Sequence, residues 1–136
     1  MKTLRLIFLC NLALTFNFAL GQQTATLACD IEALEGGANP AEACYFTEDP
    51  EVNPELFTIE AQVGEEITWE GEDRIVIRKI QYYKGRNIFD KDPEGNGQIK
   101  ARPNQKTEGD PYYYRIHFKI DGTEKNFIID PIIRTR

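Results

Sequence analysis

The sequence predicts an all-β domain, an antiparallel β-sandwich of immunoglobulin-like type with seven or eight strands. Three observations lead to this fold class. Apolar and polar residues alternate with period two in several segments, helical periodicity is weak, and turn signals rich in glycine, proline and aspartate separate the alternating segments. A small closed β-barrel is the alternative architecture, because it is built from the same kind of strand.

The clearest strand covers residues 112–121. Its even-numbered residues are apolar or aromatic up to position 120 and its odd-numbered residues are mostly polar, which indicates one buried and one solvent-facing side. An Asp-Gly hairpin signal follows, and the returning strand covers residues 125–130. Paired residues share a face, so Phe127 must meet an even-numbered partner. A two-residue loop sets Ile116 opposite Phe127, whereas a four-residue loop sets Phe118 there.

The remaining strands follow from the same alternation. Residues 74–84 change phase, because Ile77 and Ile80 cannot share a face in a regular strand. Either a bulge near Arg78-Lys79 or burial of both faces of the strand resolves this conflict. Trp69 is assigned to the core, since it alternates with an isoleucine and is large. Further strands are expected at residues 24–33, 56–63, 67–69 and 131–135, which makes seven, and residues 87–90 and 98–102 are candidates for additional short strands.

The N-terminal segment predicts export. Residues 1–21 combine a positive head with an apolar stretch and with small residues before a cleavage point ahead of Gln22, as in a secretory signal peptide. Residues 22–136 then form a single β-sandwich domain. The expected location is secreted or periplasmic. A membrane anchor needs about 20 apolar residues, which neither this stretch nor any later one supplies, so no membrane span is expected after signal removal.

Two cysteines downstream of the signal are predicted to form a disulfide bond. Cys29 and Cys44 would meet oxidising conditions in an exported protein, and they are the simplest pair available there. The bond closes a loop of about 15 residues, which contributes about 3 kcal/mol of stability in the chain-entropy account. A reactive thiol pair is the alternative, but the spacing is not C-x-x-C and no basic residue flanks either cysteine.

The charge balance narrows the choice of partner. The full chain has a net charge of −6, and removal of the signal with its two basic residues changes this to −8. A chain this acidic is repelled by phosphate backbones and by anionic lipid surfaces, so neither nucleic acid nor a membrane surface is expected as a partner. A protein or a glycan remains as the expected partner.

The residue inventory disfavours catalysis. The chain contains no serine, and His117 is its only histidine. Serine nucleophiles, structural zinc sites and blue-copper sites therefore lack the residues they require. We expect no enzyme activity, no catalytic residue and no cofactor, with calcium left open. A carboxylate-based glycoside hydrolase is the remaining enzymatic alternative, because 22 acidic residues offer many carboxylate pairs.

One segment resembles the start of a calcium-binding loop. Asp90, Asp92, Glu94 and Asn96 place oxygen-bearing side chains at alternate positions, as calcium ligands do in helix-loop-helix sites. The closing glutamate of that pattern is absent, since Ala101 stands in its place. A solvated hairpin loop is the alternative, because the same residue types favour turns for backbone reasons.

Two tyrosines are the candidate binding residues. Tyr83 and Tyr113 are expected on outward faces of strands, where tyrosine rings stack on sugars or enter protein interfaces. The main hypothesis is therefore a small exported, non-catalytic binding or structural module of the cell envelope or extracellular space. The alternative is a carbohydrate-binding module that uses Tyr83 and Tyr113.

Overall fold

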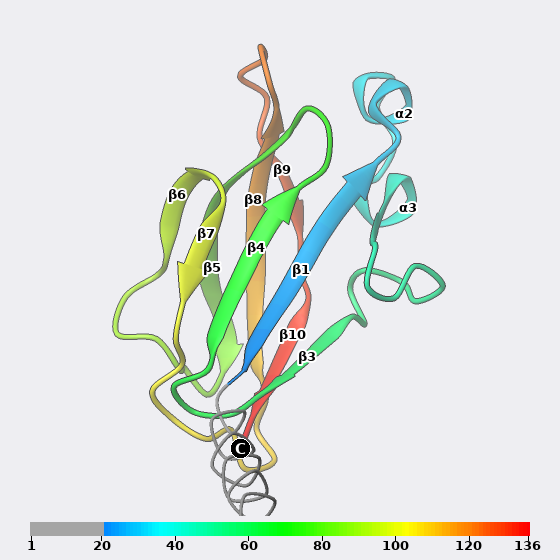
Figure 1. Ribbon diagram of the computed structural model, residues 1–136. Helices are drawn as coiled ribbons and strands as arrows, with labels where there is room; N and C mark the ends of the chain where they lie inside the picture. Colours follow the sequence, from blue (N-terminus) through cyan, green and yellow to red (C-terminus); the bar gives the residue numbers. More distant parts are fainter. Residues whose placement is uncertain (1–20) are drawn as a thin grey trace, which may run out of the picture.

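The computed structural model describes residues 21–136, which form two facing β-sheets (Figure 1). The predicted signal peptide lies outside the described residues apart from Gly21. Sheet A contains, in spatial order, β2 (Cys44–Phe46), β1 (Gln22–Cys29), β4 (Glu66–Gly71) and β7 (Ile99–Ala101). Sheet B contains β3 (Thr58–Ala61), β10 (Ile132–Thr135), β8 (Tyr112–Ile120), β5 (Ile75–Gly85) and β6 (Glu94–Gly97), with β9 (Phe127–Ile129) also paired to β8.

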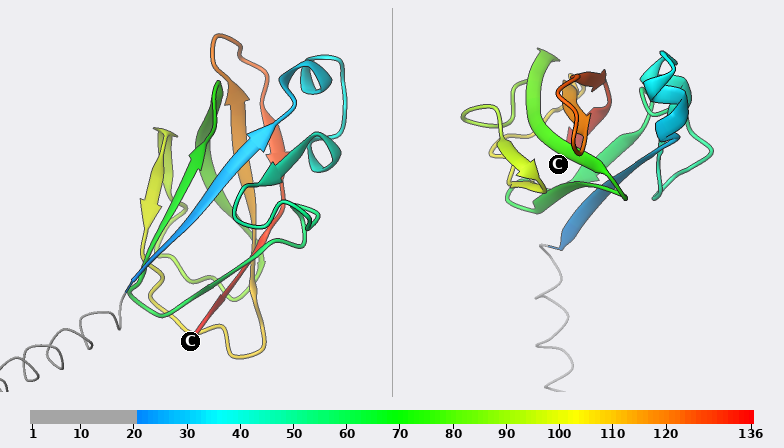
Figure 2. Two further views of the ribbon diagram at one scale, coloured as in Figure 1. Left: turned by 45° about the vertical axis from the view of Figure 1, so that its right-hand side comes forward. Right: turned by 90° about the horizontal axis from the view of Figure 1, so that it is seen from above.

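The two-layer arrangement confirms the predicted all-β sandwich, and two turned views make the layers visible (Figure 2). The described strands number ten, more than the seven or eight expected. The sheets are also mixed, because β1 runs parallel to β4 and β10 runs parallel to β3. A parallel pair needs a long crossover connection. The segment between β1 and β4 supplies one, since it holds both helices, β2 and β3.

Strand β8 follows the predicted alternation over its whole length. Its even-numbered residues are buried and its odd-numbered residues are partly exposed. Strand β5 pairs with β8 along nearly all of its length, and the register shifts between Ile77 and Lys79. This confirms the predicted bulge, which leaves Arg78 exposed and returns Ile80 to the buried face.

The β8–β9 hairpin takes the register that the four-residue loop predicts. Phe118 lies opposite Phe127, and Ile116 lies opposite Ile129. The two phenylalanine rings stack with centroids 5.5 Å apart. Aromatic cross-strand contacts of this kind contribute about 0.2–1 kcal/mol each.

The strand predicted at residues 24–33 ends early, and a helix replaces its second part. Asp30 caps α2 (Ile31–Glu35) by accepting a hydrogen bond from the Ala33 amide at 3.1 Å. A second short helix, α3 (Pro40–Ala43), begins with proline at its first position. The prediction from alternation was wrong here because capping side chains satisfied the backbone in another way.

The predicted disulfide is present between Cys29 and Cys44. The two residues lie directly opposite each other in the antiparallel β1–β2 pair, with Cα atoms 4.0 Å apart. The bond therefore fastens both ends of the segment that contains α2 and α3 to sheet A (Figure 1).

The segment predicted as a strand at residues 87–90 is irregular, although it is buried. Ile88 is fully buried, and the Phe89 ring packs edge-on against Trp69 and Tyr112 with centroid distances of 6.1 and 5.3 Å. Its apolar residues fill the core without joining a sheet. The strand prediction was wrong because a short apolar run indicates burial and does not by itself indicate a strand. The predicted strands at 56–63, 98–102 and 131–135 exist in shortened form as β3, β7 and β10.

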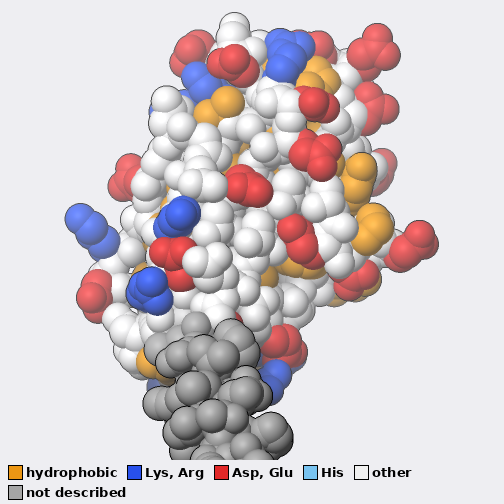
Figure 3. Space-filling view, in the orientation of Figure 1, with side chains coloured by type: hydrophobic (Ala, Val, Ile, Leu, Met, Phe, Trp, Pro, Cys, Tyr) orange, Lys and Arg blue, Asp and Glu red, His pale blue; other side chains and the backbone are white. Residues whose placement is uncertain are grey.

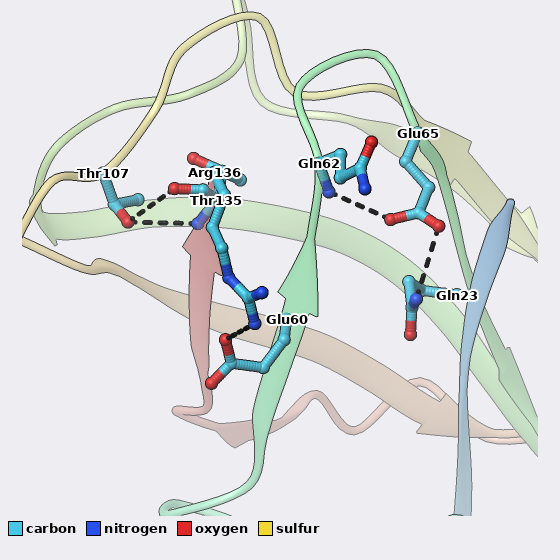
Figure 4. Close-up of polar contacts among 7 residues, drawn as sticks. All are labelled: Gln23, Glu60, Gln62, Glu65, Thr107, Thr135 and Arg136. Atoms are coloured by element: carbon cyan, nitrogen blue, oxygen red, sulfur yellow. Dashed lines mark hydrogen bonds and ion pairs between the residues drawn. The ribbon is translucent and has the colours of Figure 1, made fainter. Parts of the chain in front are cut away.

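Hydrogen bonds join chain segments at the end of the sandwich where β1 begins and where β3 and β10 end (Figure 4). The Thr135 amide donates to the Thr107 hydroxyl at 3.0 Å. The Glu65 side chain is only 7% exposed, and its carboxylate accepts from the Gln62 amide at 2.9 Å and from the Gln23 side chain at 3.4 Å. Glu65 therefore has a structural role at this end of the sandwich.

The core occupies the space between the sheets, and this leaves the outer faces for other roles. Trp69 lies wholly buried within it, as predicted. None of the helices among residues 21–136 has the length and hydrophobicity that crossing a membrane requires. The largest wholly buried side chains come from both sheets and are Trp69, Tyr112, Tyr114, Phe46 and Phe118.

Candidate binding face on strands β5 and β8

The structure brings the two predicted tyrosines together on the outer face of sheet B. Tyr83 is 45% exposed and lies at a second irregularity of β5, where the register shifts between Tyr82 and Lys84. Tyr113 lies on the neighbouring strand β8, opposite Lys84. Alternation from the buried Ile80 turns Tyr83 outward, and the extra residue turns Lys84 outward as well, so that it lies opposite Tyr113.

Cationic side chains cover both rings. The Lys84 ammonium lies 4.9 Å from the centroid of the Tyr113 ring and 5.7 Å from that of Tyr83. The Arg115 guanidinium lies 4.0 Å from the Tyr83 centroid and also forms an ion pair of 3.7 Å with Asp130. Each cation–π contact at an exposed site contributes about 0.5–1 kcal/mol. The tyrosines are thus held in place and surrounded by positive charge.

This positive charge continues along both strands. Strands β5 and β8 contain five lysine or arginine residues and no aspartate or glutamate. We call the outward polar and aromatic side chains of these strands the β5–β8 face. Its members are Arg78, Lys79, Gln81, Tyr83, Lys84, Tyr113, Arg115, His117 and Lys119.

A polar hollow of about 290 Å³ lies at one end of the β5–β8 face. The three lysine and arginine residues of its lining come from β5 and β8, and its two carboxylates come from β6 and from the β8–β9 loop. Among residues 21–136, the three cations form no ion pair with any carboxylate. The charged and amide side chains of the lining are Arg78, Lys79, Lys119, Glu94, Glu124, His117 and Asn126.

His117 is held between two amides in the wall of the hollow. Its Nε2 lies 2.7 Å from the Gln81 side-chain oxygen, and its Nδ1 lies 3.0 Å from the Asn126 side-chain nitrogen. Nε2 therefore carries the proton and donates to Gln81, while Nδ1 accepts from Asn126. Burial, followed by the charges of Lys79 and Arg115, lowers the pKa of His117 below its ordinary value. The ring is neutral at pH 7, and both of its nitrogens are engaged.

The four residues of the predicted calcium segment do not converge on one point. Asp90 accepts from the Asn104 side chain at 2.7 Å, and Asp92 accepts from the Tyr82 amide at 3.0 Å. Glu94 and Asn96 belong to β6, a strand that the sequence did not predict. Within the described part of the chain, no three acidic, histidine or cysteine side chains come together as a group able to hold a metal ion. Asp92 instead ties its loop to β5.

Charge is separated along the chain, a feature that sequence reasoning missed. Residues 21–73 contain 14 acidic residues and no lysine, arginine or histidine, whereas residues 74–136 contain 14 basic and 8 acidic residues. The first part builds β1 to β4 with both helices, and the second part builds the remaining strands, including β5 and β8. In the space-filling view, acidic side chains without basic ones lie over α2 and α3 (Figure 3). A charge count by segment would have revealed this asymmetry.

Comparison with known proteins gives no indication of the function of this site. The chain matches no protein-family model and no curated protein. A sandwich of two sheets serves many unrelated roles, so the fold by itself does not define a function. The function is therefore inferred from the residues of the β5–β8 face.

Proposed function

We propose that this chain is an exported, non-catalytic binding module and that the β5–β8 face is its binding surface. One observation carries the proposal. Five cationic residues and two outward tyrosines gather on two adjacent strands that contain no carboxylate, in a chain whose net charge is −6. A solvated face needs no such sorting, because mixed charges serve solubility equally well. A partner with negative charge would relieve the mutual repulsion of these cations.

The environment of His117 and Asp130 on this face favours binding over catalysis. His117 is neutral, and both of its nitrogens already have amide partners. Asp130 forms an ion pair of 3.7 Å with Arg115, so this carboxylate is engaged as well. Residues arranged in this way can hold and orient a ligand, but they offer no activated nucleophile.

A carbohydrate ligand is the second part of the proposal, and the tyrosines favour it. Tyr83 is 45% exposed, and it lies near Tyr113 on the outer face of sheet B. Aromatic side chains with a polar tip suit ligands that are apolar on one side and hydroxylated at the edges.

Export is supported by the disulfide and by the signal-like N-terminus. The bond between Cys29 and Cys44 is of a kind that persists in oxidising compartments such as the periplasm or the extracellular space. Mass spectrometry of the chain purified from its native source should give a first residue of Gln22. Recovery of the full chain in the cytoplasm with both thiols reduced would contradict export.

A glycan array with matched variants tests the binding face. The variant Lys84→Gln/Arg115→Gln should lose about tenfold or more in affinity for any glycan retained by the parent, because the ligand loses charged partners. The control Lys100→Gln/Lys106→Gln removes the same charge from two exposed positions outside β5 and β8 and should bind as the parent does. Equal losses in both variants, or no retention of any glycan or acidic polymer, would refute the proposed surface. Release of reducing sugar ends from a bound glycan would refute the absence of catalysis.

A further inference from the structure

We infer that the ligand of the β5–β8 face is a linear acidic polysaccharide of the uronate type, lying along β8 with one sugar residue in the polar hollow. This inference rests on the proposed function and specifies the class of ligand. It is drawn from three independent features, namely the spacing of the cations, the mixed lining of the hollow and the overall charge of the chain.

The spacing of the cations matches an extended polymer. The strand register places Lys119 opposite Val76, His117 opposite Lys79, and Arg115 opposite Gln81. The Lys84–Tyr113 pair forms the last row. Outward residues of a strand recur about every 6.8 Å, so these rows extend over about 20 Å. Each row holds at least one cation, and a compact anion could reach only one or two of them.

The hollow is lined for a group that carries both a carboxylate and hydroxyls. Arg78, Lys79 and Lys119 have no ion-pair partner among the described residues and can meet an acidic group. Glu94 and Glu124 can accept hydrogen bonds only, and sugar hydroxyls are suitable donors. Glu94 lies opposite Lys79 in the β5–β6 pair, so the acceptor and the cation stand side by side. A volume of about 290 Å³ has room for one sugar residue that carries a carboxylate.

The same two carboxylates disfavour other anionic polymers. A polyphosphate or a run of aspartate and glutamate side chains brings no hydroxyl to satisfy Glu94 and Glu124, and it is repelled by them. The net charge of −6, or −8 after signal removal, adds repulsion that grows with the charge density of the ligand. One charge per sugar residue keeps that density moderate. The guanidinium of Arg115, stacked on Tyr83 at 4.0 Å, offers a carboxylate its paired donors beside an aromatic ring.

A pair of matched ligands tests the inference directly. Binding of the processed chain is measured by calorimetry to polygalacturonate and to the same polymer with its carboxyl groups reduced to alcohols. Loss of the carboxylates should weaken binding about tenfold or more. Equal affinity for both polymers would overturn the inference and leave the proposed binding function standing. Poly-glutamate is the third ligand, and binding as tight as that of polygalacturonate would show that an acidic protein fits the face equally well and would also overturn it.

Variants of the hollow complete the test. Arg78→Gln/Lys119→Gln should weaken polygalacturonate binding about tenfold or more, and Lys100→Gln/Lys106→Gln should leave it unchanged. Polygalacturonate should also shift the NMR signals of the His117 ring, since that ring forms part of the wall. Unchanged affinity in the hollow variant, or an unperturbed His117 signal at saturation, would overturn the placement of a sugar there. Failure of every glycan to bind would instead refute the proposed function itself.

Discussion

The indole nitrogen of Trp69 donates a hydrogen bond of 3.1 Å to the hydroxyl of Tyr114, and this contact joins the two sheets. Trp69 belongs to β4 of sheet A and Tyr114 to β8 of sheet B, and both side chains are wholly buried. Their rings meet edge to face, with centroids 5.9 Å apart. Burial raises the pKa of Tyr114 above its ordinary value, so the hydroxyl keeps its proton, and its oxygen accepts the indole hydrogen bond.

Removal of the acceptor should destabilise the fold. In Tyr114→Phe the Trp69 N–H loses its partner in the core, which costs about 1–3 kcal/mol of unfolding free energy. Urea denaturation provides the measurement. Tyr113→Phe changes the same residue type on the outer face and should stay within about 0.5 kcal/mol of the parent. If Tyr114→Phe were as stable as the parent, the inter-sheet hydrogen bond would have no energetic role.

The disulfide should contribute a similar amount by a different route. It encloses a separation of 15 residues between Cys29 and Cys44, and loop closure of that length contributes about 3 kcal/mol through the unfolded chain. The variant Cys29→Ala/Cys44→Ala should therefore unfold at a lower urea concentration. The parent treated with reductant should behave in the same way, whereas reductant should not affect the variant. If reductant left the urea midpoint of the parent unchanged, the disulfide would not contribute to stability.

Much of this fold could be predicted because apolar and polar residues alternate in the strands that have one buried and one solvent-exposed face. In β8 the alternation gave both the buried residues and the outward position of Tyr113. The phase change around Ile77 and Ile80 gave the bulge, since no regular strand buries both. Local chemistry determined these features, and no distant part of the chain was needed to recognise them.

The missed elements depend on tertiary contacts or on capping. Strand β2 has only three residues, and it pairs with β1 where the disulfide joins the two strands. Helix α2 depends on a single capping aspartate, Asp30. Strand β6 was hidden in a segment whose residues favour turns, and pairing with β5 made it a strand. Short elements of this kind carry too few residues for periodicity to show.

The candidate site could be predicted only in part for a related reason. The outward tyrosines follow from each strand taken alone. The hollow, however, requires Lys79 of β5, Glu94 of β6 and Lys119 of β8 to meet, and the register of three strands decides this. A shift of one residue in any pair would turn these side chains to the opposite face, so no single segment encodes the site.

Gly85 should tolerate no side chain. Its backbone has φ of +84°, and an added Cβ would lie 1.8 Å from the carbonyl oxygen of Pro111. Backbone atoms of β5 and the chain entering β8 would have to separate, so Gly85→Ala should cost about 3–5 kcal/mol. Gly122 has a similar φ of +89° with no atom within 4 Å of an added Cβ, and Gly122→Ala should cost only about 1–2 kcal/mol. Equal urea midpoints for the two variants would show that the approach to Pro111 does not matter.

Calcium should leave the stability of the chain unchanged. The carboxylates of Asp90 and Asp92 already accept hydrogen bonds from Asn104 and from the Tyr82 amide, and they do not converge on one point with a third acidic group. We therefore expect the same melting temperature with 5 mM CaCl₂, a concentration on the order of that used by weak extracellular sites, and with EDTA. A calcium-dependent rise that Asp92→Ala removes would establish the site that the sequence suggested.

His117 should make the fold less stable in mild acid. Its pKa lies below the ordinary value of 6.5, because burial and the charges of Lys79 and Arg115 disfavour the protonated ring, while Asp130 opposes this shift in part. Above pH 6.5 both the folded and the unfolded chain carry a neutral ring, and its contribution is fully present. As the pH falls below 6.5 the unfolded chain binds the proton first, so unfolding free energy is lost until the folded pKa is passed.

The geometry around the ring gives this loss a structural cause. A proton on Nδ1 would face the Asn126 side-chain nitrogen, which is 3.0 Å away and is itself a donor, so the amide must turn over or the contact must break. NMR titration of the ring should give a midpoint below 6.5. His117→Gln removes this titration, and it should show a smaller fall in unfolding free energy between pH 7.5 and pH 5 than the parent, with the effects of the carboxylates common to both proteins. A midpoint at or above 6.5 would mean that the protonated ring finds a partner on the β5–β8 face, because only a favourable contact to the charged form can raise a partly buried histidine against two neighbouring cations.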